Sequence, residues 1–204
     1  MNGTAHAAVG GGAGLVVANT LQTDPTTTII LIGLGGVSAL IPDLDTDGKL
    51  RGKMTFSYKR FRGIAQFISL LMVGYSYATA QYVGIGLGLF LLGIVSSIRS
   101  KHMLTLTGIG VALSGSFFAE TWIFLFGIYI FIASVVSHRG YTHSILGVIF
   151  FGMIAKKLDL ALGINGVFHT CLAGYISHLF LDSRLWPFNK RGIKLFLPIS
   201  SKEW

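Results

Sequence analysis

The chain alternates long apolar runs with short polar or charged connections. Runs of this kind predict helices, because only a helix satisfies the backbone polar groups of an apolar segment within that segment. The stretch 64–98 is too long for one helix and has the length of a helical hairpin. The pattern therefore predicts an all-α protein with about eight helices, in the segments 5–21, 26–42, 64–81, 83–98, 103–118, 121–137, 144–155 and 160–181.

Composition indicates that lipid surrounds most of these segments. Hydrophobic residues make up 52% of the 204 residues and charged residues only 12%, about half the charged share of an ordinary soluble domain. We expect a multi-pass transmembrane helical bundle that forms a single integral membrane domain over residues 1–204. Several segments are shorter than the roughly 20 residues of a perpendicular transmembrane helix, so some are expected to be tilted or re-entrant.

The net charge of +8 indicates how the bundle is oriented. In the predicted topology every Lys and Arg except Lys156 and Lys157 falls on one side of the membrane. Since positive residues favour the cytoplasmic side, we expect both termini in the cytoplasm, with 43–63 as a basic loop and 183–204 as a basic tail. Anionic lipid headgroups, rather than nucleic acid, are the expected partners of this charge.

A small set of ionisable residues lies at or near the predicted membrane depth, where such groups are expensive and mark functional sites by default. They come from four stretches that are distant in sequence, and the topology brings each stretch to the cytoplasmic ends of the segments. This convergence predicts one site, whose candidate residues are His6, Asp43, Asp45, His138, Arg139, His143, His178 and Asp182.

The residue types favour a metal site. His and Asp without Cys suit Zn²⁺, Mn²⁺ or iron. His178 and Asp182 are four residues apart, which places them on one face of a helix. His169 lies nine positions before His178, about half a turn around, and is expected to be a packed core residue. His102 is expected to be a surface residue.

In the two remaining stretches the candidate residues do not share one helical face. His138 and His143 are five residues apart, a poor spacing for one helical face, and Gly140 predicts a turn between them. If the chain is extended at Asp43 and Asp45, the two side chains point in opposite directions. One would then bind the metal while the other orients a histidine.

Four motifs, "TAHAAVG", "LIPDLD", "HRGYTHS" and "GYISHLFLD", occur in this order and resemble the YdjM-type family of LexA-binding, inner-membrane-associated metal-dependent hydrolases. That family in turn is distantly similar to the zinc-dependent phospholipase C and P1 nuclease group. The resemblance implies a bacterial inner-membrane location. It also implies metal ligands at His6, Asp43, His138, His143, His178 and Asp182, with Asp45 either a ligand or a neighbour that orients one.

These observations together predict a membrane-embedded, metal-dependent phosphoesterase that acts on a phospholipid or lipid-linked phosphate at the cytoplasmic headgroup level. We expect two or more divalent ions, Zn²⁺ before Mn²⁺, that activate water and hold the phosphate. Arg139 is expected to bind phosphate in a bidentate manner. Asp45 is expected to orient or deprotonate the attacking water.

Two other functions fit parts of the sequence. The chain could be a non-enzymatic membrane protein that binds a cytoplasmic regulator such as LexA through 43–63 and 184–204, with a structural metal. It could also be an ion transporter, since buried His and Asp residues mark ion pathways. Aspartate-rich coordination favours chemistry over a structural zinc site, which is usually closed and rich in Cys.

Overall fold

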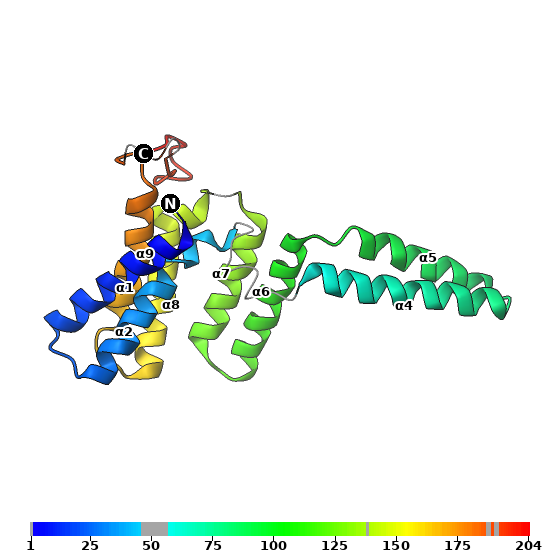
Figure 1. The fold of residues 1–204 in the computed structure, drawn as a ribbon, viewed down its shortest axis with the longest axis horizontal. Helices are drawn as coiled ribbons and strands as arrows, with labels where there is room; N and C mark the ends of the chain where they lie inside the picture. Colours follow the sequence, from blue (N-terminus) through cyan, green and yellow to red (C-terminus); the bar gives the residue numbers. More distant parts are fainter. Residues whose placement is uncertain (1, 46–56, 138, 187–188, 190–191) are drawn as a thin grey trace.

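The structure is a computed structural model that describes residues 2–45, 57–137, 139–186, 189 and 192–204. Over these residues the chain is all-α, with eight α-helices, two short 3-10 helices and no strand (Figure 1). The α-helices are α1 (Gly3–Thr20), α2 (Pro25–Ser38), α4 (Tyr58–Ala78), α5 (Tyr82–Ser96), α6 (Ser100–Phe117), α7 (Thr121–Val135), α8 (Ile145–Leu162) and α9 (Val167–Asp182). The 3-10 helices are η1 (Ile41–Asp45) and η2 (Tyr141–His143). Each predicted apolar segment corresponds to one α-helix, so the all-α prediction is confirmed.

Neighbouring helices in the chain pack as pairs: α1 with α2, α4 with α5, α6 with α7, and α8 with α9. Helix α9 also packs against α1 and α2, and α7 packs against α8. The α4–α5 hairpin projects away from these helices (Figure 1). The prediction of a helical hairpin over 64–98 is therefore confirmed.

Local sequence signals set where the first two helices begin. Asn2 caps α1, because its side-chain oxygen accepts the N–H of Ala5 at 2.9 Å. Asp24 caps α2 by accepting the N–H of Thr26 at 2.9 Å, and Pro25 occupies the first helical position, where no N–H is needed. The Asn2 cap places His6 in the first turn of α1.

Helices α1, α2 and α9 approach one another with their backbones almost in contact. The carbonyl oxygen of Gly35 in α2 lies so close to Gly10 of α1 and to Gly174 of α9 that a Cβ on either glycine would overlap it. Close approach through small residues gives strong van der Waals packing between helices. These three glycines therefore fix how α1 and α9 sit on α2.

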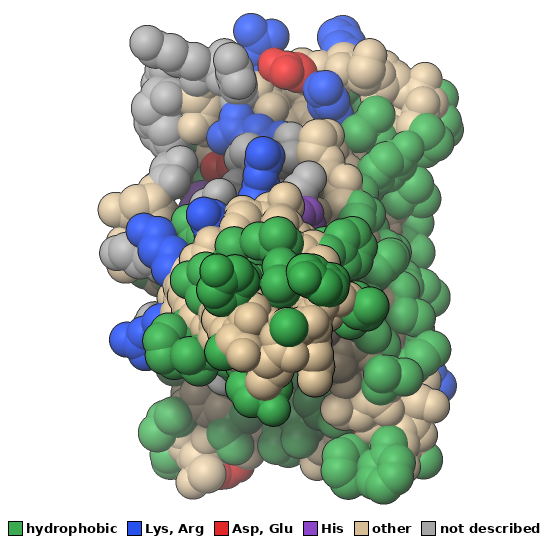
Figure 2. Space-filling view, turned by 90° about the vertical axis from the view of Figure 1, so that its right-hand side faces the viewer, with side chains coloured by type: hydrophobic (Ala, Val, Ile, Leu, Met, Phe, Trp, Pro, Cys, Tyr) green, Lys and Arg blue, Asp and Glu red, His purple; other side chains and the backbone are tan. Residues whose placement is uncertain are grey.

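The surface of the protein is unusually apolar. Large apolar side chains are exposed on every α-helix, and they cover much of the face shown in Figure 2. Among the described helices, none combines the length and the apolar character needed to cross a membrane, so the multi-pass arrangement is not confirmed.

The described N-terminal residues and the C-terminal tail lie at the same end of the molecule (Figure 1). On the face shown in Figure 2, most Lys and Arg side chains gather toward that end. The structure thus agrees with the expectation that both termini lie on one side, whereas the cytoplasmic location stays a prediction. Most of the predicted basic loop, residues 46–56, lies outside the described residues.

Gly35→Ala is expected to destabilise the protein, because the new methyl group would meet the backbone oxygen of Gly10. Overpacking of this kind costs about 1–3 kcal/mol. Gly33→Ala is the matched control, because a Cβ at Gly33 in the same helix meets nothing within 4 Å. A thermal unfolding scan should show a lower Tm for Gly35→Ala, and an unchanged or higher Tm for Gly33→Ala; equal values would contradict the packing described here.

Candidate metal centre

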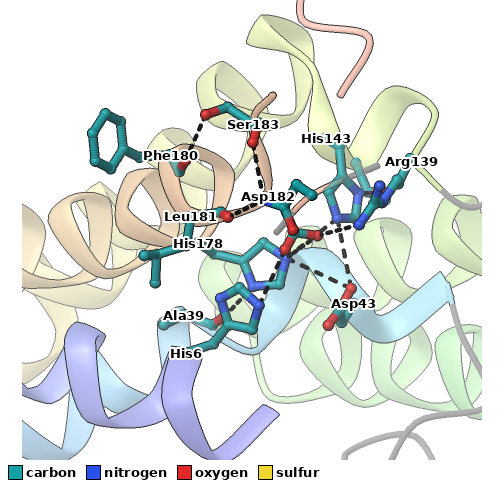
Figure 3. A network of polar contacts seen from close by, with 12 residues as sticks. His6, Ala39, Asp43, Arg139, His143, His178, Phe180, Leu181, Asp182 and Ser183 are labelled. Atoms are coloured by element: carbon teal, nitrogen blue, oxygen red, sulfur yellow. Dashed lines mark hydrogen bonds and ion pairs between the residues drawn. The ribbon is translucent and has the colours of Figure 1, made fainter. Parts of the chain in front are cut away.

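Five ionisable residues from separate parts of the chain meet at one end of the helical body (Figure 3). His6 comes from the first turn of α1, Asp43 from η1 after α2, and His143 from η2 between α7 and α8. His178 and Asp182 come from the last turns of α9. The predicted convergence of these four stretches is confirmed.

Four of the five residues form a group that could hold a metal ion. One donor atom from each of Asp43, His143, His178 and Asp182 lies within 4.8 Å of all the others. The Nε2 atom of His178 lies 3.3 Å from Nε2 of His143 and 3.6 Å from Oδ1 of Asp43. Both imidazoles are fully buried, whereas the Asp43 side chain is 28% exposed. The group is therefore enclosed on the histidine side and open beside Asp43.

A backbone contact sets the tautomer of His178. Its Nδ1 atom lies 2.7 Å from the carbonyl oxygen of Ala39 at the end of α2. Because a carbonyl oxygen only accepts hydrogen bonds, Nδ1 carries the hydrogen and Nε2 presents its lone pair to the group. A histidine ligand held in this way is already in the state that binds a metal.

A buried chain of polar contacts supports His143. The Nδ1 atom of His143 lies 3.1 Å from the Thr142 hydroxyl. The Tyr175 hydroxyl of α9 donates to the Thr142 carbonyl and lies 2.9 Å from the Tyr129 hydroxyl of α7. The η2 turn is thus tied to α7 and α9, which orients the His143 ring toward the group.

Asp182 presents its two carboxylate oxygens to different neighbours. Oδ1 lies 3.3 Å from Nε2 of His6, and Oδ2 lies 3.2 Å from the Arg139 guanidinium and 3.8 Å from His178. The His6 ring is buried and stacks on His178, with ring centroids 4.0 Å apart. The Nδ1 atom of His6 has no hydrogen-bond partner among the described residues.

The donor set fits a small divalent cation. A tetrahedral zinc ion with ligand bonds of about 2.1 Å needs donor atoms roughly 3.4 Å apart. The separations of 3.3 Å between the two Nε2 atoms, and of 3.6 Å from each to Asp43 Oδ1, are close to that value. Two carboxylates would also balance the charge of a divalent ion.

Asp43 is held in its charged form. Burial raises its pKa, but hydrogen bonding to His143 and the charges of His178 and His143 outweigh this effect, so the pKa is lowered. The carboxylate is therefore ionised at neutral pH and available to a cation.

Comparison with known proteins identifies the family. A family model described as YdjM inner membrane protein matches residues 1–204, which is the whole chain. The chain belongs to this family. Searches of the curated proteins and of the solved structures found no match. The distant similarity of YdjM-type proteins to phospholipase C and P1 nuclease is therefore not shown for this chain.

Some predicted residues are not tested. His138 lies outside the described residues, as does the side chain of Asp45. The backbone from Asp43 to Asp45 is a 3-10 turn rather than the extended chain considered above. Two residues apart on such a turn, Asp43 and Asp45 need not point in opposite directions.

The other two histidines lie outside the centre, as predicted. His102 is exposed, and its Nδ1 atom accepts the N–H of Arg99 at the start of α6. The prediction that His169 is a packed core residue is wrong, because His169 is exposed. It lies about half a turn around α9 from His178, away from the buried residues of that helix.

The supporting groups around the ligands were not found from the sequence. Thr142 is adjacent to His143, and Tyr175 lies three residues before His178 on the same face of α9, so spacing gave a signal for both. No sequence pattern could identify the Ala39 carbonyl as the partner of His178, because every residue has a carbonyl group.

His178→Ala is expected to remove most of the bound metal from the purified protein, because it deletes a buried donor at the middle of the group. His169→Ala is the matched control, since it removes an exposed histidine from the same helix. Elemental analysis of both variants and the parent protein tests this prediction. Full metal content in His178→Ala would exclude His178 as a ligand.

Proposed function

We propose that the protein is a metal-dependent phosphoesterase that acts on lipid phosphates at the surface of the inner membrane. The observation that carries this proposal is the cluster of Asp43, His143, His178 and Asp182, which is buried among helices yet open at Asp43. Structural zinc sites are usually closed and rich in Cys, whereas this group contains no Cys and its Asp43 carboxylate is partly exposed. An aspartate- and histidine-rich centre with an open side favours catalysis.

Zinc is the metal we propose, with manganese as the alternative. Donor spacing near that of a tetrahedral site supports zinc, and carboxylate oxygens are also suited to manganese. We still expect the centre to bind two or more metal ions. The support for a second ion is that Asp182 offers Oδ1 toward His6 and Oδ2 toward His178, the arrangement of a carboxylate that can serve two ions.

A divalent ion bound here would supply Lewis acidity and lower the pKa of a water molecule. The protein's own residues would bind and orient the substrate. Arg139 is 23% exposed and lies 3.2 Å from the Asp182 carboxylate of the centre, and its guanidinium can hold two phosphate oxygens at once. Asp45, two residues after Asp43 in η1, is our proposed base for the attacking water.

The surface of the protein supports the proposal of a lipid substrate. Exposed apolar side chains surround the helical body, and basic side chains gather at the end that carries the centre (Figure 2). We propose that the body is embedded in the inner membrane as a multi-pass bundle, with this end at the level of the cytoplasmic headgroups, where basic residues meet anionic lipid. Binding of a cytoplasmic regulator such as LexA stays a prediction.

The direct test is phosphate release by the purified, metal-loaded protein from phosphatidic acid and from p-nitrophenyl phosphate. His143→Ala is expected to abolish release together with metal content, and His169→Ala is expected to retain both. Release that persists in His143→Ala, or a metal-loaded parent protein that cleaves neither compound, would contradict the proposal.

Arg139→Asn tests the phosphate-binding role separately from the metal. Arg139 has a positive φ of 57°, and asparagine tolerates that backbone region better than most residues. The variant is therefore expected to keep its metal and its fold while losing roughly 10²–10³-fold in turnover, the usual effect of removing a charge-stabilising donor. Unchanged turnover with full metal content would exclude this role.

A further inference from the structure

A second feature lies near the start of α8 and the end of α9: an apolar cavity between these two helices and the C-terminal tail. Its volume is about 730 Å³, within the range of roughly 300–1,000 Å³ that is usual for small-molecule sites. Val148 of α8 and Ile176 and Leu179 of α9 contribute helical side chains, and Phe196 and Trp204 contribute aromatic side chains from the tail. The lining is almost entirely apolar.

Backbone hydrogen bonds hold the tail against the helices as a fixed wall of this cavity. The N–H of Ile145, at the start of α8, donates to the Leu195 carbonyl at 2.9 Å. The N–H of Arg184, just after α9, donates to the Trp204 carbonyl at 2.9 Å. Ile193 and Trp204 exchange two further backbone bonds of 3.1 and 2.9 Å. Figure 1 shows the tail beyond the ends of these helices.

The same two short segments, residues 143–145 and 182–184, contribute residues to both the metal centre and the cavity. Ser183 and Arg184, which line the cavity, directly follow the candidate ligand Asp182. Ile145, another lining residue, lies two positions after the candidate ligand His143. The apolar cavity and the candidate metal centre are therefore adjacent along the chain at two places, and the lining of the cavity carries one basic and one acidic residue, Arg184 and Glu203.

We propose that this cavity binds one acyl chain of the lipid phosphate whose headgroup is cleaved at the metal centre. The assignment of the headgroup rests on the proposed function, whereas the assignment of the chain rests on the cavity. An apolar lining favours a hydrocarbon chain. Of the two charged side chains in that lining, Arg184 and Glu203, Arg184 can pair with the phosphate to which the chain is attached. A water-soluble phosphate would use the metal centre alone and leave the cavity unfilled.

Chain-length dependence tests this proposal. Butyl, hexyl, octyl and decyl phosphate carry the same headgroup, and each methylene buried in the cavity should raise affinity about fourfold at most. KM for phosphate release should therefore fall with chain length and then level off when the cavity is full. The KM for p-nitrophenyl phosphate serves as the reference for the metal centre alone.

Binding can be followed without turnover through Trp204. An octyl phosphate brominated at the end of its chain should quench tryptophan fluorescence of the purified full-length chain. The quenching should fall in Trp204→Phe and be lost when Trp186→Phe is added, because the Trp186 ring lies 5.8 Å from the ring of the lining residue Phe180. This readout needs no hydrolysis.

Filling the cavity gives the decisive comparison. Ile176→Phe and Val148→Phe place a larger side chain in the cavity lining, and Ile149→Phe is the matched control. Ile149 is 56% exposed and does not line the cavity, whereas Ile176 is 46% exposed and does. We expect both cavity variants to weaken quenching and to raise KM for octyl phosphate at least tenfold. Their KM for p-nitrophenyl phosphate should stay unchanged, and Ile149→Phe should behave as the parent protein.

The outcomes separate the two proposals. Quenching that depends on Trp204 and Ile176, without hydrolysis of any phosphoester, would support the acyl-chain site and contradict the phosphoesterase. Hydrolysis that is independent of chain length, with quenching equal in Ile176→Phe, Val148→Phe and Ile149→Phe, would support the phosphoesterase and overturn the acyl-chain site.

Discussion

The close contact of three glycines in α1, α2 and α9 is the constraint on which the metal centre depends. Gly10 and Gly174 both meet the backbone of Gly35. Gly10 lies one helical turn from His6, and Gly174 lies one turn from His178. Gly35 lies one turn from Ala39, whose carbonyl contacts His178. Residues one turn apart share a helix face, so the packing that joins the backbones also aims the rings of His6 and His178.

The centre itself shows how buried polar groups are kept in one state. The Ala39 carbonyl sets the tautomer of His178, and the chain from Tyr129 through Tyr175 to Thr142 steadies the turn that carries His143. Buried polar groups that are fully paired give rigid, well-defined networks. This rigidity suits a metal centre, because ligands already at the right spacing lose little freedom when an ion binds.

The apolar cavity is connected to the centre along the chain by two short segments. Asp182 ends α9, and the next two residues enter the wall of the cavity. His143 ends η2, and α8 begins two residues later with Ile145. Under the proposed function, the chemistry and the recognition of the hydrocarbon chain would therefore be built at one junction of helix ends, where an apolar body meets a basic end.

Much of this architecture was determined by the sequence itself. Apolar runs, caps such as Asn2 and Asp24, and breaks at Gly and Pro are local signals, so the eight α-helices of the described residues and the hairpin over 64–98 could be predicted from them. The convergence of His6, Asp43, His143, His178 and Asp182 also followed, because an alternating helical topology brings both kinds of helix end to one side. Local spacing could not decide what lies opposite a given helix face: the burial of His169 was predicted wrongly for that reason. The Gly35 contact, the Ala39 partner of His178 and the cavity under the tail were decided only by the tertiary structure, since each depends on backbone atoms from helices far apart in the chain.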